Sequence, residues 1–113
     1  MKYTVSLKGN RAFRRIYAKG KSLALPAVVL YCRKNGGSGN RLGLTVGTKV
    51  GKAVYRNRIR RRLREIYRLH EGELRTGWDI VVVARTRAKE ASYQELEADF
   101  LQAAGKLGLL NHA

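Results

Sequence analysis

A basic run between positions 49 and 68 is the part of the sequence best suited to bind a charged partner. Nine of these twenty residues are Lys or Arg, and one is acidic. Arg56, Arg60 and Arg64 recur every four residues, so a helix would align them in one row, where like charges repel. Their guanidinium groups suit bidentate contact with phosphate. The run therefore indicates a helix that lies against a polyanion; the alternative is an ordinary solvated helix face.

Aromatic residues form a second candidate site. Phe13 and Tyr17 recur at helical spacing, and Tyr31 lies in a run of strand formers. Aromatic rings beside basic groups suit single-stranded RNA, because base stacking contributes about 1–3 kcal/mol per base in any sequence. The alternative is that these rings belong to the core. Gly43 and Gly47 in the next strand would either allow RNA to approach closely or mark bulges.

The sequence offers no catalytic or metal-binding pattern. His70 and His112 stand far apart, and Cys32 is the only cysteine, in a strand where it should be buried. No spacing predicts a zinc site, and no carboxylate cluster suggests bound metal ions. We therefore expect no catalytic residue, no bound cofactor and no metal site on the protein.

Charge is unevenly distributed along the chain. Residues 1–64 hold 18 Lys or Arg and no acidic residue, whereas residues 65–113 hold 6 basic and 8 acidic residues. The net charge of +16 favours phosphate backbones as partners, with anionic membranes as the competing target. The single Cys, the absence of a signal peptide and the absence of an apolar span predict a soluble cytoplasmic protein. The length predicts one domain over residues 1–113, and the charge predicts that this domain binds RNA.

Periodicity and turn residues predict the elements that position these side chains. Helices are expected at 10–19, at about 52–70, and from the N-cap Ser92, with Glu95 in a capping box, to about 104. Strands are expected at 27–33, 41–47 and 78–84, the last of them central. The first two should form a hairpin across the glycine-rich loop 35–40. The basic helix should bury one apolar stripe: Tyr55, Ile59, Leu63, Ile66 and Tyr67. The result is a mixed α/β sandwich around a small sheet.

The basic run, centred on Arg56-Asn57-Arg58, closely resembles the signature helix of the bacterial ribonuclease P protein component. The stretch 42–47, the spacing Phe13-x-x-x-Tyr17-x-x-Gly20, Tyr31 and the strand end at Ala84-Arg85 match as well. The resemblance covers most of the chain. It implies an α/β (α+β sandwich) fold in which a small mixed sheet of about four strands packs with three helices. It also implies a rare left-handed crossover, in which the basic helix joins parallel strands.

The resemblance further implies a role in removing the 5′ leader from precursor tRNA. The protein would be the accessory subunit of an endonuclease whose chemistry and magnesium requirement belong to a catalytic RNA, bound 1:1 and away from membranes. The expected contacts to that RNA are Lys49, Lys52, Arg56, Asn57, Arg58, Arg60, Arg61, Arg64 and Arg68. The expected leader cleft comprises Phe13, Arg14, Tyr17, Val29, Tyr31 and Thr45. A structural RNA-binding protein of ribosomal type remains the alternative, and a membrane-surface protein is a more remote one.

Overall fold

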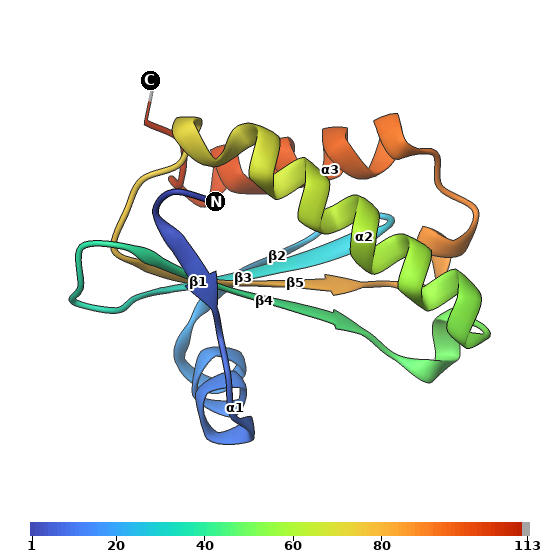
Figure 1. The fold of residues 1–113 in the computed structure, drawn as a ribbon, viewed down its shortest axis with the longest axis horizontal. Helices are drawn as coiled ribbons and strands as arrows, with labels where there is room; N and C mark the ends of the chain where they lie inside the picture. The colour runs from blue at the N-terminus through green and yellow to red at the C-terminus, as the bar shows by residue number, and fades with distance from the viewer. Residues whose placement is uncertain (112–113) are drawn as a thin grey trace.

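A five-stranded mixed sheet with the spatial order β1-β4-β5-β3-β2 organises the chain in the computed structural model, which describes residues 1–111 (Figure 1). The strands are β1 (Thr4–Ser6), β2 (Lys21–Ala24), β3 (Val28–Lys34), β4 (Asn40–Val46) and β5 (Trp78–Ala84). The helices are α1 (Asn10–Lys19), α2 (Ala53–His70) and α3 (Tyr93–Lys106), with short 3-10 turns at Thr48–Val50, Glu71–Glu73 and Thr86–Lys89. The three predicted helices and the central position of β5 are confirmed.

α2 and α3 cover one face of the sheet, and α1 covers the other (Figure 1). The larger core lies under α2 and α3, where Ile59, Leu63 and Phe100 pack against the inward-facing side chains of β3 and β5. The predicted stripe of α2 is buried as expected, except that Tyr55 is only half-buried. The smaller core joins Ile16 of α1 to Val81 of β5. Cys32 is fully buried, as predicted.

The connection from β4 through α2 to β5 joins two parallel strands. In Figure 1 both strands run from left to right, α2 returns above them, and β5 lies behind β4 as seen from the side of β1. The chain therefore follows a left-handed path from β4 to β5, which is rare among such crossovers. This agrees with the expected fold and places the whole basic helix on one face of the sheet.

The predicted hairpin between β3 and β4 is wrong. β5 lies between them, antiparallel to β3 and parallel to β4. As the most apolar strand, β5 gains most from burial between two neighbours, and the loop after β3 is long enough to cross its end. Asn35 fixes this crossing: its backbone N–H donates to Gly77 O at 2.9 Å, and its side-chain amide donates to Asp79 at 3.1 Å.

The two edge strands were not predicted from the sequence. β1 has three residues and β2 has four, too few for an alternating pattern to be distinguished. Tertiary contacts hold β1 in place: the Glu71 carboxylate accepts hydrogen bonds from the backbone N–H groups of Lys2 and Tyr3, at 2.8 and 3.0 Å. These edge strands bring the sheet to five strands.

The start of α3 has the local structure that the sequence predicts. Glu95 N–H donates to Ser92 Oγ at 3.0 Å, and Ser92 N–H donates to a Glu95 carboxylate oxygen at 3.3 Å. The reciprocal pair satisfies two backbone donors that a helix N-terminus otherwise leaves free. The helix runs two residues further than expected, to Lys106.

Candidate nucleic-acid interface

An aromatic cleft lies between α1 and the outer face of β4. Its lining, which defines the aromatic cleft from here on, is Asn10, Phe13, Arg14, Tyr17 and Thr45. Ile16 anchors α1 to the sheet, which leaves Phe13 and Tyr17 at the margin of the helix. The Tyr17 ring is edge-on to Tyr31, with centroids 4.9 Å apart, and its hydroxyl lies 3.0 Å from Thr45 Oγ1. The cleft therefore has fixed aromatic walls.

Exposure decides between a core role and a binding role for these rings. Tyr17 is 39% exposed, whereas Phe13 and Tyr31 are half-buried. A ring with an open face and a fixed edge can stack on a base without reorganisation. The structure thus gives Phe13 a partly structural role and leaves Tyr17 accessible.

Gly43 explains how Phe13 lies so close to the sheet. A Cβ atom at position 43 would lie 2.6 Å from two carbons of the Phe13 ring, closer than such atoms approach. The glycine thus allows an aromatic side chain, not an RNA strand, to approach. Gly47, in contrast, has nothing within 4 Å of its Cβ position.

The other predicted cleft residues lie nearby. Arg14 contributes to the lining and is exposed. Val29 is on the same sheet face, opposite Val83, but is not part of the lining. Asn10, at the start of α1, was not predicted; only its position one helical turn before Arg14 could have indicated it.

The exposed side of α2 carries a basic row. Asn57, Arg60, Arg61 and Arg64, with Val54, line a shallow hollow on this side, and these four polar residues are called the basic row. Asn57 accepts a hydrogen bond from Arg60 Nη1 at 3.2 Å, which orients one guanidinium group. The row faces solvent because the apolar stripe of the same helix is buried.

The remaining predicted contacts have different surroundings. Arg56 donates from Nε to Gly51 O at 3.1 Å, and so closes the loop before α2. Arg58 lies with its guanidinium carbon 5.4 Å from the centre of the Tyr55 ring. Arg68 forms an ion pair with Glu65 at 2.6 Å, and this hydrogen bond lowers the pKa of the Glu65 carboxyl. Lys49 and Lys52 are exposed just before the helix. Arg68 is therefore the member of the predicted set whose charge is locally compensated.

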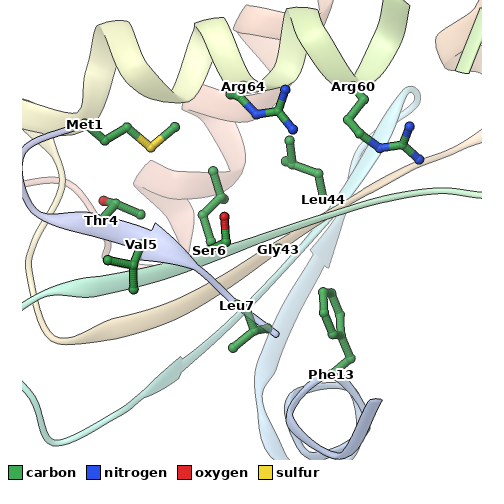
Figure 2. A pocket seen from close by; sticks show the side chains of 11 residues that line it. Met1, Thr4, Val5, Ser6, Leu7, Phe13, Gly43, Leu44, Arg60 and Arg64 are labelled. Carbon is green, nitrogen blue, oxygen red and sulfur yellow. The ribbon is translucent and has the colours of Figure 1, made fainter. Parts of the chain in front are cut away.

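A third hollow connects the aromatic cleft with the basic row (Figure 2). This junction hollow is bounded by β1, by Gly43 and Leu44 of β4, by Phe13, and by Arg60 and Arg64. It exists because β1 pairs with β4 only from Asn40 to Leu42, which leaves the rest of this β4 edge without a neighbouring strand in residues 1–111. Figure 2 shows Arg60 and Arg64 on one side of the hollow and Phe13 on the other. The two predicted surfaces are thus contiguous.

The acidic half of the chain forms contacts of another kind. His70 bonds through its two ring nitrogens to Glu73 and Glu97, joining α2 to α3. Burial lowers the pKa of His70, but its hydrogen bonds to the carboxylates of Glu97 and Glu73 outweigh this effect, and the net shift is upward. Across residues 1–111 no set of three or more His, Cys, Asp or Glu side chains is arranged to hold a metal ion. His112 lies outside the described residues.

None of the helices in residues 1–111 is long and apolar enough to cross a bilayer. The longest, α2, is amphipathic and carries most of its charge on the solvent side. Its apolar stripe packs on the sheet, so it is not available to a membrane surface.

Comparison with known proteins gives consistent matches along the chain. A family model described as Ribonuclease P matches residues 1–108. The ribonuclease P protein component of Alkaliphilus oremlandii is 42% identical over 113 residues, covering 100% of this chain and 99% of its own length. That of Natranaerobius thermophilus is 41% identical over 110 residues, covering 97% and 96%.

Solved structures agree with the sequence matches. The RNase P protein of Staphylococcus aureus superposes with a TM-score of 0.85 at 34% identity, covering 96% of this chain and 98% of that one. The RNase P protein of Thermotoga maritima gives a TM-score of 0.79 at 36% identity, covering 87% and 93%.

Proposed function

This chain belongs to the ribonuclease P protein family, and we propose that its two RNA-facing surfaces hold two different RNAs at once. It is the protein component of ribonuclease P, the ribonucleoprotein endonuclease that matures the 5′ end of precursor tRNA.

The basic row and its neighbours are proposed to bind the catalytic RNA. Arg60, Arg61 and Arg64 line one hollow on α2, with Arg61 and Arg64 exposed and Arg60 half-buried, so a phosphate backbone can contact them together. Their guanidinium groups have no carboxylate partner in residues 1–111, so each can release a counterion from RNA on binding. Lys49, Lys52, Arg56 and Arg58 extend this surface to the start of the helix, and Asn57 belongs to the row itself. Arg68 contributes less, because Glu65 already neutralises it.

The aromatic cleft, with Tyr31 and Val29 beside it, is proposed to bind the single-stranded leader. Tyr17 offers an exposed ring for stacking and Arg14 offers a charge for the backbone. Such a site tolerates any leader sequence, because every base has a face that can stack. This property suits a protein that must act on many precursors.

The observation that carries the proposal is the junction hollow. Phe13 lines both this hollow and the aromatic cleft, while Arg60 and Arg64 line both this hollow and the basic row. A leader in the cleft and a catalytic RNA on α2 would therefore meet beside the open edge of β4. Cations between two polyanions reduce their repulsion, which is strongest at low salt.

The contribution of the protein is accordingly positional and electrostatic. We propose that the RNA subunit carries the hydrolytic step with its own magnesium ions, and that the protein binds 1:1 in the cytoplasm. By screening phosphate charge and fixing the leader, the protein would lower the magnesium concentration that the complex needs. The net charge of +16 on this small domain supports this division of roles.

Reconstitution tests the proposal. The purified protein would be incubated with a bacterial ribonuclease P RNA and a labelled precursor tRNA at low magnesium, where the RNA alone is nearly inactive. We expect cleavage at the mature 5′ end only when both components are present. No stimulation of an RNA that is active at high magnesium, despite tight general RNA binding, would instead favour a structural role of ribosomal type.

A further inference from the structure

Another hollow lies on the other side of α1 from the aromatic cleft. We call it the α1 groove; its volume is about 390 Å³. One wall is the N-terminal half of α1, and the floor is formed by the end of β3 and the starts of β4 and β5. Its lining includes six basic residues from four segments of the chain: Lys8, Arg11, Arg15, Arg33, Lys34 and Arg41.

The charge in the α1 groove is almost wholly uncompensated. Asp79 is the only acidic residue of the lining, and it is 6% exposed. The Arg41 guanidinium donates to both carboxylate oxygens of Asp79 at 2.7 Å, and the Asn35 side-chain amide donates to Asp79 at 3.1 Å. One cation is therefore neutralised, and the other five have no ion pair with any carboxylate of residues 1–111.

This concentration of charge works against folding unless something offsets it. Like charges that converge from several elements repel one another, and the cost is relieved when an anion binds. The lining contains no aromatic ring and only one apolar side chain, that of Ala12. The α1 groove is thus built to contact phosphate and not to stack on bases.

The outer side of α1 connects this groove with the aromatic cleft. Arg11, Arg14, Arg15 and Lys19 line a shallow depression there. Arg11 and Arg15 also line the α1 groove, and Arg14 also lines the aromatic cleft. A helix with its side chains is about 10–12 Å wide, so an extended strand leaving the cleft crosses it within a few nucleotides while remaining beside basic side chains.

We propose that the α1 groove binds the phosphate backbone of leader nucleotides that lie 5′ of those held in the aromatic cleft. This inference rests on the proposed function. The catalytic RNA is the other source of phosphate, but the basic row assigned to it lies on α2, across the sheet from α1 (Figure 1). Continuity with the cleft through Arg14 and Arg11 assigns the α1 groove to the leader.

Leader length tests the proposal in the reconstituted complex. Affinity for two precursor tRNAs would be measured, one with a leader that only fills the cleft and one with a leader that extends well beyond it. The variant is Lys8→Gln with Arg11→Gln, two exposed residues whose side chains form no hydrogen bond within residues 1–111. The control is Arg75→Gln with Lys106→Gln, which removes the same charge from exposed positions outside every hollow described above.

We expect wild type and control to bind the long-leader precursor several-fold more tightly than the short-leader precursor. The groove variant should lose this advantage and bind the short-leader precursor normally. For the long-leader precursor, the slope of the logarithm of the binding constant against the logarithm of the salt concentration should become shallower by about 1.4. Each lost single-strand phosphate contact removes about 0.7 from this slope, and the variant loses two. Arg33→Gln, on the sheet side of the groove, should act in the same direction.

Three outcomes would overturn the assignment. The first is that the wild type gains nothing from the longer leader, and the second is that the groove variant keeps the gain. The third is that the groove variant weakens binding to the catalytic RNA alone, which would give the α1 groove to that RNA. Failure of the proposed function is distinguishable, because it would abolish cleavage of the short-leader precursor by the wild-type complex.

Discussion

The hydroxyl of Tyr17 on α1 lies 3.0 Å from Oγ1 of Thr45 on β4, so a side-chain hydrogen bond connects the helix with the sheet across the aromatic cleft. Both groups are exposed to solvent, and such a bond contributes about 0.5–1.5 kcal/mol. Its main effect is to fix the plane of the Tyr17 ring against Tyr31.

The Tyr17 ring, and not its hydroxyl, should determine leader binding. Tyr17→Phe keeps the stacking face and loses one exposed hydrogen bond, so precursor affinity should change little. Tyr17→Ala should weaken precursor binding by about 1–3 kcal/mol, the range for one stacked base. Mature tRNA, which has no leader, should bind all three proteins equally. Equal weakening of precursor and mature tRNA by Tyr17→Ala would contradict the leader assignment.

The basic row should control affinity for the catalytic RNA and its dependence on salt. Arg60→Glu with Arg61→Glu should weaken binding and make the logarithmic salt slope shallower by about 1.4 to 1.8, because two phosphate contacts are lost. Binding isotherms at several salt concentrations would measure both. The matched control is Arg75→Glu with Lys106→Glu, which changes net charge equally but lies off α2. If both variants change the slope to the same extent, net charge alone explains the effect.

Gly43 should be required for the packing of Phe13. Gly43→Ala places a methyl group 2.6 Å from the ring carbons, so the ring or the helix must move. Overpacking of this kind costs about 1–3 kcal/mol of unfolding free energy, and the displaced ring should also weaken leader binding. Denaturant unfolding and precursor binding would measure the two effects.

Gly47→Ala is the control for that substitution, because nothing lies within 4 Å of the added methyl group. Combining Gly43→Ala with Phe13→Leu should restore part of the stability, since the smaller side chain makes room. Full stability of Gly43→Ala would show that the contact is easily relieved.

His70 should make stability depend on pH. Its folded pKa is raised above the ordinary value of about 6.5, because burial, which lowers it, is outweighed by the hydrogen bonds of the ring to Glu97 and Glu73. The stabilisation is therefore fully present below the unfolded pKa and is lost as the pH rises through the folded pKa. Thermal unfolding from pH 5.5 upward should show this decline, and His70→Gln should flatten it. A decline of the same size in His70→Gln would place its cause elsewhere.

Local sequence patterns were sufficient to predict the features that depend on residues close together in the chain. The 3.6-residue period correctly placed Ile59 and Leu63 in the core. Of the predicted row Arg56, Arg60 and Arg64, Arg64 is exposed and the other two are half-buried. The capping box of Ser92 and Glu95 is present as expected. Such features depend on residues three or four positions apart, so the sequence contains them directly. The family was also predicted from the sequence, because the signature around Asn57 is a pattern of neighbouring residues.

Other features depend on residues far apart in the chain. The hairpin prediction failed because local turn residues cannot show that β5, some forty residues after β3, would insert beside it. The three-residue strand β1 is fixed by Glu71, 68 positions from Tyr3.

The sequence by itself determined the charged helix, its buried stripe, the central strand and the family. Only the tertiary structure decided that Phe13 packs on Gly43, that Arg60 and Leu44 border one hollow, and that basic residues converge on the far side of α1. Each of these arrangements follows from the order of strands in the sheet. That order is set by the burial of β5 between two partners, a global balance of apolar surface that no short window of sequence contains.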